Sequence, residues 1–194
     1  MKIGLIRHFK VKRGYPNSIV SSKELMNWVE EYEASDVEEN EVELSGIKWE
    51  TCYSSSMRRA EVTARRVFKG DVILLDDLRE IPLTPLFPSR VKLPLFIHLF
   101  AIRMAWWFNH PSQAESKKVV LEKIKRIVDR VISENQDILI VGHGGVMMFM
   151  RRELIRRGFS GPSFKRPENG KVYIFEKKKD DSRNHPSRAY IIKF

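Results

Sequence analysis

Two histidines far apart in this chain each follow a short apolar run. Ile3 to Ile6 leads into Arg7 and His8, and a second run, Ile138 to Val141, ends two residues before His143. Apolar runs of this length are typical of buried strands in a parallel sheet. Ligands of open α/β sheets bind beyond the carboxyl ends of the strands. The two histidines and the arginine are therefore expected at a ligand-binding edge.

Imidazole and guanidinium groups at such an edge are suited to phosphoryl transfer. A neutral imidazole is a nucleophile, and a covalent route divides one difficult displacement into two easier ones. The charge on the equatorial phosphate oxygens requires fixed cationic donors, which Arg7, Arg59 and a protonated His143 can supply. The leaving oxygen needs a proton, and Glu80 is the best-placed carboxyl group to donate it.

The segment around Arg59 predicts an anion site at a helix N-terminus. If Ser56 is the N-cap of a helix that reaches to about Phe68, Arg59 falls at position N3, in the first turn. Free backbone N–H groups there already favour an anion. Arg7 and Arg59 together form a bidentate clamp that suits phosphate geometry. The pair Gly144–Gly145 allows the backbone to approach a ligand closely.

Two assignments stay open from the residues alone. Asp76 and Asp77 precede Glu80 closely, so either of them could be the acid instead. Arg58 and Arg59 are adjacent, and only one of the two can point into the site.

The strand and helix patterns alternate along the chain. This alternation predicts βαβ units and a three-layer α/β/α, doubly wound, mostly parallel sheet. An edge hairpin is expected to join the last two strands through Lys177 to Pro186. The expected helices are Ser22–Tyr32, Ser56 to about Phe68, Ser116–Ser133 and Val146–Arg157; the expected strands are Lys2–Ile6, Thr51–Ser54, Val72–Leu75, Ile138–Val141, Val172–Glu176 and Ala189–Ile192.

A helical insertion follows the third strand. Pro82 to Pro94 is rich in proline, and Leu95 to Phe108 is strongly apolar and aromatic. The simplest interpretation is a core or capping helix; the alternatives are an apolar lid over the site or a patch that touches a membrane. We expect one domain over residues 1–194, with residues 82–110 as a cap or insertion over the site.

Composition narrows the functional class. The chain has 194 residues and a net charge of +10, which favours anionic partners such as phosphorylated metabolites, nucleic acids or acidic lipids. Its single cysteine, Cys52, excludes an internal disulfide and a multi-cysteine zinc site. No signal-peptide pattern is present and no apolar run reaches the ~18 residues of a membrane span. We expect a soluble, cytoplasmic protein.

Four motifs, taken in order, resemble those of one known family. They are Leu5 to His8, Ser54 to Ala64, Leu78 to Glu80 and Val141 to Gly145. Together they resemble the motifs of the histidine phosphatase superfamily, also called phosphoglycerate mutase-like. Any one of these motifs is weak evidence, whereas four in the family order are strong.

The resemblance implies a reaction and a role for each matching residue. It implies a phosphomonoester hydrolase in which His8 is the phosphorylated nucleophile and Glu80 the general acid. It makes Arg7, Arg59 and His143 the phosphate pocket. No metal and no other cofactor are expected, and the implied substrate is a phosphorylated small molecule.

The sequence departs from the family pattern at three places. Phe9 replaces the usual glycine after the nucleophile, and is expected to narrow the pocket mouth or alter the turn. Ser56 replaces the usual proline. The Gly-Glu-Thr-x-Trp-Asn-like segment of mutases and many phosphatases is absent, although Asn17 could occupy the corresponding loop. These departures bear on the substrate more than on catalysis.

Other functions remain as alternatives. The runner-up is phosphoglycerate mutase-type phosphoryl transfer. Cys52 and Arg58 satisfy the C-x5-R spacing of a cysteine phosphatase, although no glycine follows to form the anion loop. His8, His143 and a carboxylate could hold a metal, but two arginines beside them would repel it. The last alternative is a catalytically idle module that binds phosphate or nucleic acid. The sequence contains no nucleic-acid-binding motif, and no nucleic-acid partner is expected.

Overall fold

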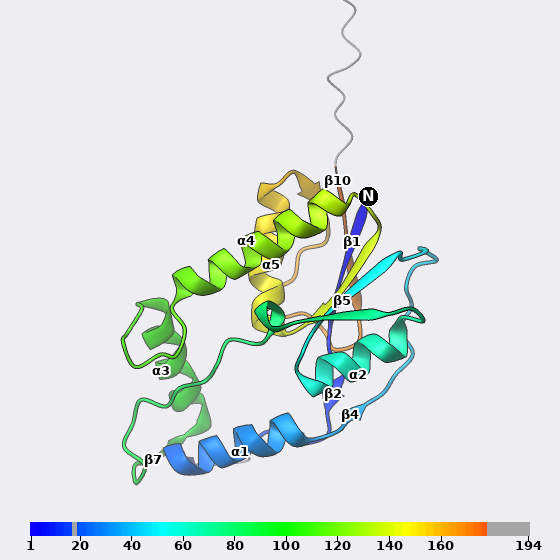
Figure 1. Ribbon diagram of the computed structural model, residues 1–194. Coiled ribbons are helices and arrows are strands. Elements are labelled where there is room, and N and C mark those ends of the chain that lie inside the picture. The colour runs from blue at the N-terminus through cyan, green and yellow to red at the C-terminus, as the bar shows by residue number, and fades with distance from the viewer. Residues whose placement is uncertain (17–18, 178–194) are drawn as a thin grey trace, which may run out of the picture.

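The computed structural model describes residues 1–16 and 19–177, which build a central sheet covered by helices on both faces (Figure 1). The strand order is β6-β5-β8-β1-β10-β9. The first four strands in this order run parallel, and β10 is antiparallel to β1. The strands are β1 (Lys2–Arg7), β5 (Thr51–Ser55), β6 (Val72–Leu75), β8 (Ile138–Gly142), β9 (Phe159–Ser160) and β10 (Val172–Lys177).

The helices and two small strand pairs surround this sheet. Strand β2 (Lys10–Val11) pairs with β4 (Val37–Glu38), and β3 (Ile19–Ser21) pairs with β7 (Lys92–Pro94). The helices are α1 (Ser22–Ala34), α2 (Arg58–Val67), the short 3-10 helix η1 (Asp76–Leu78), α3 (Leu95–Trp107), α4 (Lys117–Glu134) and α5 (Gly144–Arg156). Among the described residues, no helix is both long enough and apolar enough to cross a membrane.

The predicted α/β fold with a mostly parallel sheet is confirmed, and the expected elements within the described residues are present with small shifts at their ends. One cap is wrong: Met57, not Ser56, is the N-cap of α2, so Arg59 occupies N2. The expected strand Ala189–Ile192 and the connection leading to it lie outside the described residues. The short pairs β2–β4 and β3–β7 and strand β9 were not expected, because two or three residues carry no readable period.

Both faces of the sheet are buried, as a parallel sheet requires. On β1, Ile3 and Leu5 pack in the cluster that includes α4 and α5. Ile6 faces the other side, where it packs with Trp49 and with Ala60 of α2. The alternation of side chains along β1 therefore divides the core into two layers.

The expected insertion forms a small lobe with α1. Helix α3 and strand β7 lie beside α1 at one end of the molecule (Figure 1). Leu25 and Trp28 of α1 pack with Ile102 of α3 in one hydrophobic cluster. The buried ring of His98 bonds the carbonyl oxygen of Val20 at 2.8 Å, which ties α3 to β3. His98 is thus a structural residue.

The parallel strands bring their carboxyl ends to one edge. In the register of β1 with β8, Arg7 lies opposite Gly142. In the register of β5 with β8, Ser54 lies opposite Val141. The residues that follow β1, β5 and β8 therefore meet in space, although they are far apart in the sequence.

Candidate active site

His8 stands directly after β1 and is held by its backbone. Its N–H donates to the carbonyl oxygen of Gly142 at 3.0 Å, and its carbonyl oxygen accepts from the Asn169 side chain at 2.6 Å. The next residue, Phe9, donates its N–H to Thr63 Oγ1 at 2.9 Å. Bonds on both sides of His8 thus fix the position of the imidazole.

The ring of His8 has a defined tautomer. Its Nδ1 lies 2.6 Å from the carbonyl oxygen of Phe9. A carbonyl oxygen only accepts hydrogen bonds, so Nδ1 carries the proton and Nε2 of the neutral ring keeps a lone pair. Nε2 is therefore the nucleophilic atom of this side chain.

Burial and neighbouring charge keep His8 neutral. The side chain is buried, and this burial, together with Arg59 and Arg7, lowers its pKa to about 3 from an ordinary 6.5, although the bond to Phe9 acts in the opposite direction. A buried imidazole loses the hydration that stabilises its charged form, and adjacent cations disfavour a further positive charge. The ring is uncharged across the physiological pH range.

His143 follows β8 as the N-cap of α5 and lies beside His8. The two ring centroids are 5.1 Å apart. His143 Nε2 is 2.9 Å from Ser55 Oγ, and its fully buried ring has a pKa well below the ordinary value because of burial and then Arg59, His8 and Arg7. Sequence reasoning expected a protonated His143; in the free site the ring is neutral.

Arg7 and Arg59 both belong to the site. Arg7 Nη1 donates to the Pro167 carbonyl oxygen at 3.0 Å, and the Arg59 guanidinium lies over the Tyr32 ring, 5.4 Å from its centroid. The alternative, Arg58, is exposed and pairs with Asp36 at 2.9 Å. Of the two adjacent arginines, Arg59 is the one that lines a cavity together with Arg7.

Three buried nitrogens of the site have no hydrogen-bond partner among the described residues. They are Arg7 Nε, Arg59 Nε and His143 Nδ1. Buried polar groups are normally paired, and an unpaired one costs about 1–3 kcal/mol. A ligand rich in acceptor oxygens, such as a phosphate group, would satisfy this set of nitrogens.

Glu80 is one of two carboxyl groups that line the cavity with the arginines; the other is Glu33 of α1. Its Oε2 accepts from the Gly145 N–H at 3.2 Å, and its Oε1 accepts from the Ile81 N–H at 3.1 Å. The alternative Asp77 pairs with Arg126 at 3.1 Å and, with Asp76, lines a separate cavity against α4. Of the three carboxyl groups, Glu80 alone lines the cavity with the two arginines.

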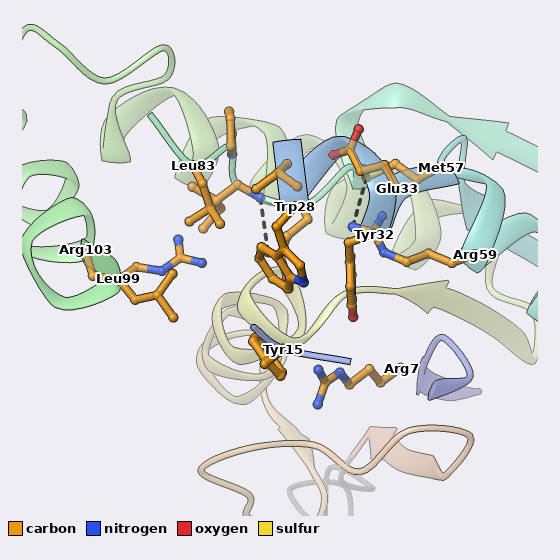
Figure 2. Close-up of a pocket in the computed structure, with 14 residues that line it drawn as sticks. Arg7, Tyr15, Trp28, Tyr32, Glu33, Met57, Arg59, Leu83, Leu99 and Arg103 are labelled. Atoms are coloured by element: carbon orange, nitrogen blue, oxygen red, sulfur yellow. Dashed lines mark hydrogen bonds between the residues drawn. The ribbon is translucent and has the colours of Figure 1, made fainter. Parts of the chain in front are cut away.

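A cavity of about 210 Å³ extends from the arginines to the lobe of α1 and α3. Figure 2 shows Trp28 and Tyr32 between Arg103 on one side and Arg59 on the other. His8 and His143 do not line this cavity; both rings are buried next to its arginines. The cationic end of the cavity adjoins the histidines, whereas its other walls are aromatic and aliphatic.

Phe9 does not line the cavity, so the first of its two expected effects, a narrower pocket mouth, is wrong. Its side chain is fully buried and packs with Val11 and Val37. Gly170 makes room for it: a Cβ there would lie 3.1 Å from the Phe9 ring, and its φ of +65° favours glycine. The ring therefore adds to the core on the side of α2.

Several residues that position the site were missed. Asn169 holds the His8 carbonyl oxygen, Ser55 contacts His143, and Tyr15 and Trp28 line the cavity. Asn169 precedes Gly170, and this Asn-Gly pair before a strand is a turn signal that would have pointed to a constrained loop. Asn17, expected in a substrate loop, lies outside the described residues.

Two rival sites find no support in the geometry. Cys52 is fully buried within β5, and burial raises the pKa of its thiol to about 12, so a thiolate is disfavoured. In the part of the chain that the structure describes, no cluster of three or more His, Cys, Asp or Glu side chains is arranged to hold a metal ion.

The family model of the histidine phosphatase superfamily (branch 1) matches residues 35–185 of the chain. The chain belongs to this superfamily. The match includes Arg59, Glu80 and His143, and it begins after Arg7 and His8. No curated protein sequence gives a significant match.

Solved structures of the superfamily fold resemble this member. An alpha-ribazole phosphatase from Shigella flexneri is 20% identical, with a TM-score of 0.53 and 80% of each chain covered. A phosphoserine phosphatase from Entamoeba histolytica is 18% identical, with a TM-score of 0.54 and 80% of each chain covered. A mycobacterial glucosyl-3-phosphoglycerate phosphatase is 17% identical, with a TM-score of 0.53, 80% of this chain and 79% of that chain covered. At these identities, the likeness shows a shared fold.

The neutral, buried state of His8 predicts a pH-dependent stability. The folded-state pKa of about 3 lies below the ordinary 6.5, so the unfolded chain binds more protons as the pH falls through 6.5. The free energy of unfolding should therefore decrease, between about pH 7.5 and 5.5, by on the order of 1 kcal/mol more in the wild type than in His8→Asn. Urea unfolding at the two pH values measures this difference. An equal change in the free energy of unfolding in both proteins would contradict the prediction.

The contact between Gly145 and Glu80 predicts a steric requirement. A Cβ on Gly145 would lie 2.5 Å from Glu80 Oε1, so Gly145→Ala must displace the carboxyl group. We expect turnover to fall about tenfold or more, in line with the loss of a positioned acid. Gly142→Ala is the matched control, because a Cβ there meets no atom within 4 Å. Equal turnover in both variants would contradict the placement of Glu80.

Proposed function

We propose that this protein is a metal-independent phosphomonoester hydrolase that works through a phosphohistidine on His8. The observation that carries the proposal is the hydrogen bond from His8 Nδ1 to the Phe9 carbonyl oxygen, which leaves Nε2 unprotonated beside Arg7 and Arg59. Membership of the superfamily supports the reaction class. Because the structural neighbours named above are phosphatases, hydrolysis is favoured over mutase-type transfer.

In the first step, His8 Nε2 attacks the phosphorus atom. The bond from Nε2 to phosphorus forms while the bond from phosphorus to the leaving oxygen breaks. Glu80, in its protonated form, gives its proton to that oxygen, so the alcohol leaves neutral. Arg7 and Arg59 turn their unpartnered Nε–H groups to the equatorial oxygens, where charge is concentrated in the transition state.

In the second step, water replaces the imidazole. The Glu80 carboxylate takes a proton from the attacking water, the oxygen bonds to phosphorus, and the bond from Nε2 to phosphorus breaks. Inorganic phosphate leaves, and both His8 and Glu80 return to their starting states. The Nδ1–H bond to Phe9 is kept throughout, which holds the ring in line with the reacting bond.

His143 gains its role when the phosphate binds. In the free site the neighbouring arginines disfavour its charged form. The negative charge of a phosphate opposes this effect and favours a protonated ring. His143 Nδ1–H and Nε2–H could then both donate, the first to a phosphate oxygen and the second to Ser55 Oγ.

We propose that residues 82–110 cap the site and that the walls of the cavity select the leaving group of the substrate. Leu99 and Arg103 of this segment face the cavity that Tyr15, Trp28 and Tyr32 also line. The Tyr15 and Trp28 rings are stacked, with centroids 5.2 Å apart. Aromatic walls beside a phosphate cradle suit a phosphorylated small molecule whose leaving group has a planar, apolar surface.

The nucleophile is tested by His8→Asn. Its amide can replace Nδ1–H at the Phe9 carbonyl oxygen but offers no nucleophilic nitrogen, so hydrolysis of p-nitrophenyl phosphate should be lost with the fold intact. Wild-type turnover should persist in EDTA. It should decline at alkaline pH, where the general acid is ionised, and below about pH 4, where His8 with its pKa of about 3 becomes protonated. Substantial activity in the variant, or loss of wild-type activity in EDTA, would overturn the mechanism.

A matched control addresses the cysteine alternative. Cys52→Ser changes a buried side chain outside the cavity and should leave turnover unchanged. Acid-labile phosphate bound to the wild type, and absent from His8→Asn, would identify the covalent intermediate directly.

The leaving-group preference is tested by Tyr15→Ala. Tyr15 is half exposed, so the variant should fold. Loss of its ring should lower kcat/KM for p-nitrophenyl phosphate about three- to tenfold, the range expected for one aromatic contact, with little change for glycerol phosphate. Tyr15→Phe keeps the ring and is the matched control. An equal decrease for both substrates would argue against an aromatic subsite.

A further inference from the structure

Helix α3 has an apolar outer face that the described residues do not cover. The exposed fractions are 71% for Phe96, 67% for Phe100, 46% for Trp107 and 72% for Phe108. Scattered single apolar side chains on a surface are ordinary, whereas an aromatic group on one helix marks an interaction site. We refer to these four residues as the aromatic face.

The aromatic face is not needed to hold α3 in the fold. His98, Ile102 and Trp106 are buried and attach the helix to the rest of the molecule. At about 100° per residue, Phe96 and Phe100 lie about 200° from His98 and Ile102 respectively, on the opposite side of the helix. A surface helix normally carries polar residues on that side. The aromatic face therefore requires another explanation.

The chain segment that carries this face contains basic residues and no acidic ones. From Ile81 to Ala114 the sequence contains no Asp or Glu, while it contains Arg90, Lys92 and Arg103. Beyond this segment, Lys117 Nζ lies 3.4 Å from the centroid of the Trp107 ring. Lys117 thus places a cationic group against one of the exposed aromatic side chains.

We propose that the aromatic face binds the surface of an anionic phospholipid bilayer. Exposed Phe and Trp side chains beside Lys and Arg are the pattern of helices that lie in the membrane interface. The rings would enter the boundary between headgroups and acyl chains, while Lys117 contacts lipid phosphates. Helix α3 has 13 residues, too short to span a bilayer, so the association is peripheral.

A second copy of the chain fits this face less well. A symmetric dimer brings the same patch of each subunit together. Lys117 of both copies would then lie in one interface, and residues 81–114 supply no carboxylate to compensate this charge. An anionic lipid surface complements both the apolar and the cationic parts of the face.

The test is sedimentation with vesicles. Wild-type protein should sediment with vesicles that contain about one-third phosphatidylglycerol and remain mostly in solution with phosphatidylcholine alone. Phe96→Ser/Phe100→Ser should lower the partition coefficient on the order of tenfold or more. Ile155→Ser, an exposed apolar position on α5, is the matched control and should bind like the wild type.

Activity and mass separate the remaining outcomes. Phe96 and Phe100 do not line the cavity, so the double variant should hydrolyse p-nitrophenyl phosphate like the wild type, which also shows that it folds. Wild-type protein that sediments with neither kind of vesicle would overturn the proposal. So would a wild-type dimer, measured by sedimentation equilibrium, that the double variant converts to a monomer without any lipid binding, because a second copy would then occupy the face.

Discussion

The parallel pairing of β1 with β8 is the constraint on which the site depends. Its register sets Arg7 opposite Gly142, and His8 donates its N–H to the Gly142 carbonyl oxygen. This brings His8 and His143, which are 135 positions apart in the sequence, to a ring separation of 5.1 Å. Since side chains alternate along a strand, a shift by one residue would turn Ile3 and Leu5 out of their layer of the core. The hydrophobic core therefore enforces the geometry of the two imidazoles.

The same burial leaves positive charge and unpaired polar nitrogens in the site, which a bound anion would stabilise. Two neutral imidazoles and two guanidinium groups lie close together, with three buried nitrogens lacking partners among the described residues. Such a set costs stability in the free protein. A site that is unsatisfied until a charged ligand arrives is preorganised for that ligand, because no protein contact has to break before the new bonds form. Fold stability and anion binding are thus coupled through the same atoms.

The sequence alone predicted the mostly parallel sheet and the superfamily. Buried strands are visible in the sequence as apolar runs. In a parallel sheet, the residues that follow these strands lie at the same edge. Local sequence patterns could not identify the N-cap residue of α2, which is Met57 and not the expected Ser56. Nor could they place Phe9, because its direction depends on Gly170, which comes from the other end of the chain. The neutral state of His143 likewise depends on burial that only the assembled fold provides.

Helix α3 joins the two surfaces for which functions are proposed here. Leu99 and Arg103 line the cavity, while Phe96 and Phe100 lie on the outer side of the same helix. One turn of helix therefore separates a side chain that would meet the substrate from one that would meet a bilayer. Because the backbone of a helix is rigid over this length, the two sides cannot change position independently. Binding at the aromatic face would fix α3, and with it the wall of the cavity formed by Leu99 and Arg103.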